Sequence, residues 1–278
     1  MNPSLLPAWS DRPKVVIGML HLRPLPGSPR FDGDVARVRD ELLRDADALA
    51  GGGVDGLMME NFGDVPFYPD GVPAHVVAHM TALACAVRDR VPHLPLGINV
   101  LRNDGRAALA VAHACGASFI RVNVLCGARV ADQGILHGIA HELMRDRAML
   151  GGQGNAIKVL ADLDVKHSAP LGAPRAIEDE VDDTIARGLA DAVIVSGAGT
   201  GKGTDPQHVA AVRAAAAGRV PVFVGSGVSV ESLDALLPHA DGFIVGTSLK
   251  RGGLVDHPID VDRVRALTGA VGPRRVRE

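Results

Sequence analysis

The sequence predicts an α/β fold in which one domain forms a closed (β/α)₈ barrel. Short apolar runs alternate with helical patterns eight times along the chain, which is typical of parallel strands joined by helices. The last two runs each open into a small turn, Gly225-Ser226-Gly227 and Gly246-Thr247-Ser248. Barrels of this kind hold phosphate in the loops after strands seven and eight. The sequence therefore predicts a barrel of the phosphate-binding type.

Eight apolar runs are expected to form the strands: 15–20, 56–60, 96–100, 119–124, 157–163, 192–196, 222–225 and 242–246. Continuous apolar runs indicate strands that are buried on both faces. Eight strand–helix units in about 250 residues match a closed barrel better than an open doubly wound sheet. A GxGxxG turn after the first run, which the open alternative would favour, is absent.

The helices are expected at 34–50, 75–90, 107–114, 138–150, 178–187, 206–217, 230–236 and 261–267. Glycines at 51–53, 188 and 218 end three of them, as C-cap glycines do. Asp205-Pro206 begins another with a cap followed by proline. Because no low-complexity linker divides the chain, we expect an N-terminal extension 1–13, a barrel 14–270 and a tail 271–278.

Composition excludes several classes of partner. The 278 residues are 47% hydrophobic and 22% charged, with a net charge of −3 and a pI of about 6.4. Nucleic-acid binding requires a basic surplus that is missing here, and no apolar stretch is long enough to span a membrane. Cys85, Cys115 and Cys126 form no CxxC pair. We expect a cytoplasmic protein with no nucleic-acid or membrane partner.

Polar residues at the expected strand ends are candidates for the site, because barrel function resides at the carboxyl ends of the strands. Alternation along 119–124 directs Arg121 and Asn123 into the barrel. Buried polar groups are costly without partners, so we expect these residues to contact substrate or one another. The strand-end residues expected to bind substrate are His21, Asn61, Asn99, Arg121, Asn123 and Ser196.

Glu60 is the first candidate for a general acid or base. It follows Gly56-Leu57-Met58-Met59, an apolar setting that could raise its pKa towards neutrality. A structural ion pair with Arg121 or a lysine is an equal alternative.

The segment 161–167 supplies further candidates for catalysis, Asp162, Lys166 and His167. Lys166 could hold a phosphate or carbonyl oxygen, and His167 could transfer protons. Asp162 and Asp164 could instead join Glu60 and His167 around a divalent metal, although the spacing does not demand one. A solvated loop whose acidic residues cap the following turn is the structural alternative.

The glycine-rich loop 196–205 resembles a P-loop, but Lys202 is followed by glycine and not by Ser or Thr. A lid that closes over ligand and contacts it through Thr200 or Lys202 is the favoured interpretation, and a surface loop is the alternative. The loops 61–74 (with Phe62, Phe67 and Tyr68) and 125–138 are long for a barrel. Either could contribute to the pocket or to a subunit interface, and we expect a homo-oligomer.

The two turns near the end of the chain are expected to bind a phosphate group through Gly225, Ser226, Gly227, Gly246, Thr247 and Ser248. Tight connections between elements also use glycine. Two such turns on the last two strands favour the anion site.

Several segments resemble the BtpA family: 15–25, 60–67, 121–127 with 132–134, 164–167 and 246–250. The resemblance covers about residues 14 to 268 and implies a phosphate-binding TIM barrel related to the tryptophan synthase alpha subunit. Family members are named for photosystem I biogenesis or for their position beside carbohydrate-uptake genes, so it implies fold better than activity. The matching positions are His21, Glu60, Asn61, Asp64, Arg121, Asn123, Asp132, Lys166 and His167.

Three functions remain open. The first is an enzyme that acts on a phosphorylated sugar or nucleotide-like metabolite as a lyase, an isomerase or a glycosidic-bond-cleaving enzyme. The second is a non-catalytic assembly factor that binds partners through the loop 61–74 with its three aromatic residues (the aromatic loop). The third is a metal-dependent hydrolase. Inward-facing Arg121 and Asn123 favour the enzyme, and no cofactor is firmly implied.

Overall fold

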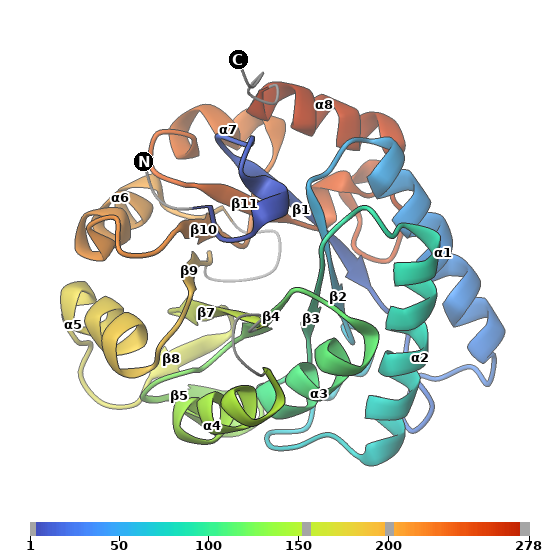
Figure 1. Ribbon diagram of the computed structural model, residues 1–278, viewed down its shortest axis with the longest axis horizontal. Helices are drawn as coiled ribbons and strands as arrows, with labels where there is room; N and C mark the ends of the chain where they lie inside the picture. The colour runs from blue at the N-terminus through green and yellow to red at the C-terminus, as the bar shows by residue number, and fades with distance from the viewer. Residues whose placement is uncertain (1–3, 152–156, 198–202, 273–278) are drawn as a thin grey trace.

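The computed structural model describes residues 4–151, 157–197 and 203–272. Its centre is a closed barrel of parallel strands in the order β1-β11-β10-β9-β7-β4-β3-β2 (Figure 1). The predicted fold class is confirmed, and the strand ends differ by one or two residues from those expected. The barrel strands are β1 (Val15–His21), β2 (Gly56–Glu60), β3 (Leu96–Asn99), β4 (Phe119–Val122), β7 (Lys158–Leu163), β9 (Ala192–Val195), β10 (Val222–Val224) and β11 (Gly242–Val245).

Helices surround the barrel in Figure 1, one after each strand–loop unit. Four helices begin with an aspartate whose side chain accepts a hydrogen bond from a backbone N–H of the first turn: Asp34, Asp104, Asp205 and Asp260. A π-helical segment, η2 (Asp183–Arg187), continues the fifth helix. The helices are α1 (Val35–Gly51), α2 (Ala74–Arg90), α3 (Gly105–Cys115), α4 (Ala140–Gly151), α5 (Ile177–Asp182), α6 (Pro206–Ala216), α7 (Val230–Leu236) and α8 (Val261–Val271).

Alternation along the strands divides the core into two layers. Residues such as Ile98, Ile120 and Val122 pack outward against the helices. Met58, Phe119 and their neighbours on the other strands fill the barrel interior. The same parity carries the polar residues at the strand ends into the mouth of the barrel.

Trp9 closes the opposite, amino end of the barrel, although the sequence assigns 1–13 to an extension. It lies in the short helix η1 (Pro7–Trp9), and its ring centroid is 5.6 Å from that of Phe119 and 6.3 Å from that of Phe223. Its indole Nε1 donates to the carbonyl of Asp55 at 2.8 Å. In Figure 1 this blue segment crosses over the strands. Leu6 and Trp9 of this segment are thus part of the core.

A three-stranded antiparallel sheet stands where a loop was predicted at 125–138. It consists of β5 (Ala128–Ala131), β6 (Gly134–His137) and β8 (Ser168–Pro170), in the order β6-β5-β8. The strands are short, and all of their residues except Leu136 are half-buried or exposed, so they lack the apolar run that marks the barrel strands. Among the described helices, none is both long and apolar enough to cross a membrane.

Candidate functional site

Strand register places four of the predicted site residues in one row. His21 is aligned with Glu60, Glu60 with Asn99, and Asn99 with Arg121 on the neighbouring strands β1 to β4. All four lie at the carboxyl ends and share the inward parity of their strands.

Glu60 is buried in this row. Its Oε2 accepts a hydrogen bond from Asn99 Nδ2 at 2.5 Å, and its Oε1 lies 3.9 Å from His21 Nε2. The alternative in which Glu60 pairs directly with Arg121 is not realised, because Arg121 turns to Asp162. Asn99 therefore orients the Glu60 carboxylate while one of its oxygens stays near the cavity.

Arg121 and Asp162 form a buried bidentate ion pair. Arg121 Nε and Nη2 each lie 2.8 Å from an oxygen of Asp162. Asn123 Nδ2 donates to the same carboxylate at 2.9 Å, and so does the hydroxyl of Ser196. Burial lowers the pKa of Arg121, but the charge and hydrogen bonds of Asp162 outweigh it and leave that pKa raised. With these donors, Asp162 positions the Arg121 guanidinium.

His21 is a neutral side chain at physiological pH. Burial, followed by the positive charges of Lys250, Lys166 and Arg121, holds its pKa well below the usual value. Its ring stacks on Phe62 with centroids 4.6 Å apart. Its Nδ1 is buried and has no hydrogen-bond partner in the described part of the chain.

Lys166 and Arg102 bring two further cations to the mouth of the barrel. Burial lowers the pKa of Lys166. Arg102, which is also buried, donates from Nη2 to the carbonyl of Lys166 at 2.5 Å and so fixes that loop. Arg102 was not predicted, although its place just beyond the expected strand 96–100 would have marked it.

The two predicted phosphate turns line one cavity of about 250 Å³. The hydroxyl of Ser248 donates to the carbonyl of Val228 at 2.6 Å and ties the turns together. The wall also contains Glu60, Arg121 and Lys166. Thus the turns and the strand-end residues face the same space.

Glycine is required at two of these positions for different reasons. Gly227 has φ of +64°, a conformation that side chains rarely adopt. A Cβ on Gly246 would lie 2.8 Å from the ring of His21.

Arg263 of α8, which was not predicted, also lines the cavity and donates from Nε to the carbonyl of Ser248 at 2.7 Å. No strand-end pattern marks a residue in the last helix.

Other predicted site residues lie elsewhere. Asn61 holds the loop after β2, since its amide accepts from the backbone of Leu101 at 2.7 Å and donates to Asp64 at 3.2 Å. His167 is exposed and does not line the cavity. Thr200 and Lys202 fall outside the described residues, so the lid stays a prediction.

The metal set suggested by the sequence is not brought together. Asp162 faces Arg121, whereas Asp164 lies 2.7 Å from Arg129 Nη1 and 3.6 Å from His208 Nε2 on the other side of the strand end. Across the described ranges, no three His, Cys, Asp or Glu side chains are grouped so that they could hold a metal ion.

Comparison with known proteins relates the whole barrel to one family. The BtpA family matches residues 12–272. An uncharacterized protein of Thermococcus kodakarensis is 50% identical over 254 residues, which cover 91% of this chain and 94% of the relative. The photosystem I biogenesis protein BtpA of Synechocystis is 46% identical over 259 residues, covering 92% and 87%.

Among solved structures, N-(5'-phosphoribosyl)anthranilate isomerase from Pyrococcus furiosus has a similar fold, with a TM-score of 0.55 at 11% sequence identity. The match covers 93% of this chain and 98% of the isomerase. At this identity the likeness concerns the fold alone. On the family match and the identity to its members, the chain belongs to the BtpA family.

Proposed function

We propose that this protein is an enzyme that binds a phosphorylated sugar or nucleotide-like metabolite and acts on it by acid–base chemistry. The observation that carries the proposal is the shared cavity, in which the turns after β10 and β11 face Glu60, Arg121 and Lys166. Phosphate at one end would place the rest of the molecule over the strand ends. The name of the isomerase with a similar fold refers to a phosphoribosyl compound, which accords with such a ligand.

The phosphate group would be held by the turns. Backbone N–H groups of small turns and the hydroxyls of Ser226 and Thr247 are suitable donors to a dianion. Arg263 would add a guanidinium from the rim, since only its Nε is used by the carbonyl of Ser248.

Glu60 would move the proton. Asn99 donates a hydrogen bond to one oxygen of its carboxylate, and the other oxygen lies 3.9 Å from His21 Nε2. Lys166 would stabilise negative charge that develops on the substrate. Asp162, which is committed to Arg121, would act as a positioning residue, and the exposed His167 receives no role. A lyase, an isomerase and a glycosidic-bond-cleaving enzyme would all use these groups.

The aromatic loop bears on the alternative of an assembly factor. Phe62 stacks on His21, lines a neighbouring cavity and is only partly exposed, while Tyr68 is 47% exposed. A loop whose first aromatic ring packs on a residue of the site suits ligand binding better than adhesion to a partner. The enzyme therefore remains the better-supported function.

Thermal unfolding with a panel of phosphorylated sugars tests the proposal. A ligand at 100 times its Kd stabilises the fold by about 2.7 kcal/mol, so Tm should rise with phosphorylated sugars and not with the parent sugars. Glu60→Gln should keep this shift and lose turnover of the compound that gives it, by roughly 10²-fold or more. No shift with any phosphorylated compound would refute the binding site. Full turnover in Glu60→Gln would remove Glu60 from the chemistry.

A further inference from the structure

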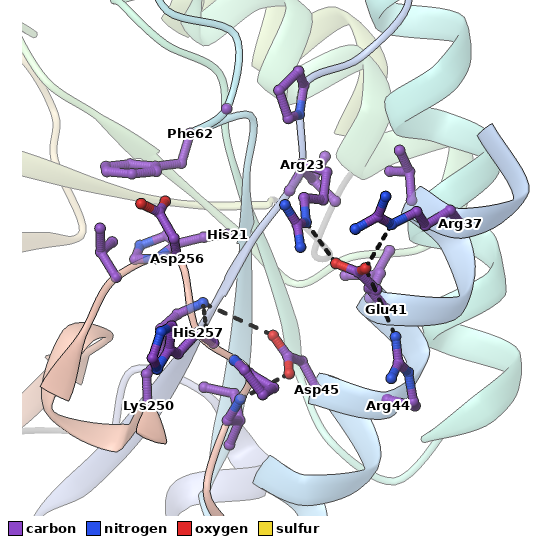
Figure 2. Close-up of a pocket in the computed structure, with 18 of the residues that line it drawn as sticks. His21, Arg23, Arg37, Glu41, Arg44, Asp45, Phe62, Lys250, Asp256 and His257 are labelled. Carbon is purple, nitrogen blue, oxygen red and sulfur yellow. Dashed lines mark hydrogen bonds and ion pairs between the residues drawn. The ribbon is translucent and has the colours of Figure 1, made fainter. Parts of the chain in front are cut away.

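A second cavity, of about 640 Å³, adjoins the phosphate-binding one. Figure 2 shows it between the residues after β1, the outer face of α1 and the loop that follows β11. The proposed phosphate site does not use it. Its size is within the range of cavities that hold small molecules.

The two cavities share His21 as a lining residue. They also share the chain after β11, because Thr247 and Ser248 line the first cavity and Lys250 and Arg251 line the second. The His21 side chain is 9% exposed, and its Nδ1 has no hydrogen-bond partner within the described residues. A buried polar atom without a hydrogen-bond partner destabilises the fold. A ligand that extends past His21 would supply a hydrogen-bond partner for Nδ1.

Charge on the wall of the second cavity is predominantly positive. Its acidic side chains are Asp32, Glu41, Asp45 and Asp256. Its cationic side chains are Arg23, Arg30, Arg37, Arg44, Lys250 and Arg251. The wall therefore carries two more cations than acids (six less four), with His21 neutral.

The geometry of the arginines shows where this surplus lies. Arg23, Arg37 and Arg44 all point to Glu41 in Figure 2, at N–O distances of 2.5, 3.0 and 3.9 Å. Arg37 also lies 3.3 Å from Asp32, so two carboxylates face three guanidinium groups, each of which has five N–H donors. Lys250 lies across the cavity, buried, with Nζ donating to the carbonyl of His257 at 3.1 Å and 3.9 Å from Asp45. Donors for a further anion therefore remain on two sides.

We infer that the two cavities form one elongated site whose ligand carries two anionic groups. A phosphate occupies the turns after β10 and β11, and a second phosphate or a carboxylate lies among Arg23, Arg44 and Lys250. His21 contacts the portion between them. This inference rests on the proposed function and narrows its substrate class to phosphorylated compounds that carry a second anionic group.

Calorimetric titration of the full chain with matched ligands tests the inference. Inorganic phosphate probes the stronger of the two anion subsites, which is expected to be the turns. Fructose 6-phosphate is compared with fructose 1,6-bisphosphate for a second phosphate, and glucose 6-phosphate with 6-phosphogluconate for a carboxylate. At least one compound with two anionic groups should bind about tenfold or more tightly than its partner with one anionic group. Equal affinities in both pairs would overturn the inference.

Variants in the second cavity locate the effect. Arg23→Gln combined with Arg44→Gln should abolish the advantage of the second anion and leave the Kd of inorganic phosphate unchanged. Both arginines are solvent-accessible, so the fold should tolerate their loss. Arg39→Gln, on an exposed position of α1 outside both cavities, is the matched control and should bind like the wild type. An advantage that persists in the double variant contradicts the second site.

The outcomes separate the two proposals. Binding of phosphate without any gain from a second anion would overturn only the elongated site. No binding of phosphate or of any phosphorylated sugar would overturn the proposed function and the elongated site together.

Discussion

Arg121 and Asp162 form a buried charged pair beneath the site, and each depends on the other. Both side chains are at most 2% exposed. An isolated charge at such a depth is costly, whereas the pair with its extra donors from Asn123 and Ser196 is satisfied.

Arg121→Met should therefore destabilise the protein by roughly 3–5 kcal/mol, because it leaves Asp162 buried without its cation. The double variant Arg121→Met with Asp162→Leu should recover part of that loss. Urea unfolding of the three proteins measures it. A double variant less stable than Arg121→Met would show that the pair itself provides the stability.

His21 makes stability depend on pH. Its pKa in the folded protein is well below the usual 6.5. Below pH 6.5, His21 therefore binds a proton in the unfolded chain but not in the folded protein. The contribution of His21 to the free energy of unfolding is fully present above pH 6.5 and decreases as the pH falls below it. The loss grows as the pH decreases below 6.5 and levels off once the pH falls below the lowered pKa of the folded protein.

The measurement is urea unfolding at pH 7.5 and 5.5 for the wild type and His21→Gln. The variant should lose less stability between the two pH values, because glutamine does not titrate. The raised pKa values of Asp45, Asp64 and Glu180 act with the opposite sign and are common to both proteins, so they cancel in the comparison. An identical loss in both proteins would mean that His21 titrates normally in the fold.

At the scale of elements, the β5-β6-β8 sheet depends on Arg129. Its Nε donates to the hydroxyl of Ser168 at 2.7 Å, and its Nη1 pairs with Asp164 at the same distance. These contacts join the hairpin to the loop after β7. Few buried apolar side chains support them, since only Leu136 of the hairpin strands is buried.

Arg129→Gln should increase amide hydrogen exchange in β5 and β6 while exchange in the barrel strands remains as slow as before. Hydrogen exchange read by mass spectrometry checks this prediction. Arg145→Gln, on exposed α4, is a suitable control. Unchanged protection of residues 128–137 in Arg129→Gln would show that the hairpin is held by other contacts.

The barrel strands were predictable because each is a continuous apolar run, and the inward parity of Arg121 and Asn123 followed from alternation. The hairpin was not predictable in this way, since its two strands have only four residues each and β5 also pairs with β8, which is distant in sequence. Trp9 was missed for a related reason. A single aromatic residue in a proline-rich segment carries no periodicity, and only the closed barrel provides the cavity that it fills.

For the molecule as a whole, the carboxyl-end rule selected His21, Glu60, Asn99 and Arg121, which the register places in one row. It also selected Asn61, whose amide is used by neighbouring loops. The rule gives a strand end but not the direction in which a loop side chain turns. Arg102 and Arg263 come from a loop and a helix, so their approach to the site depends on packing between distant segments.

Closure of the barrel brings the turns after β10 and β11 next to β1 and β2, which begin the chain. This arrangement is the reason why residues around 225–248 and Glu60 can act on one molecule. The central claim is that phosphate binds at these turns within reach of the strand ends.

A crystal structure of the protein soaked with a phosphorylated sugar that raises its Tm tests this claim most directly. The account predicts a phosphate between the turns Gly225–Gly227 and Gly246–Ser248, with the sugar extending towards Glu60. A phosphate bound elsewhere, or a sugar directed away from Glu60 into solvent, would contradict it.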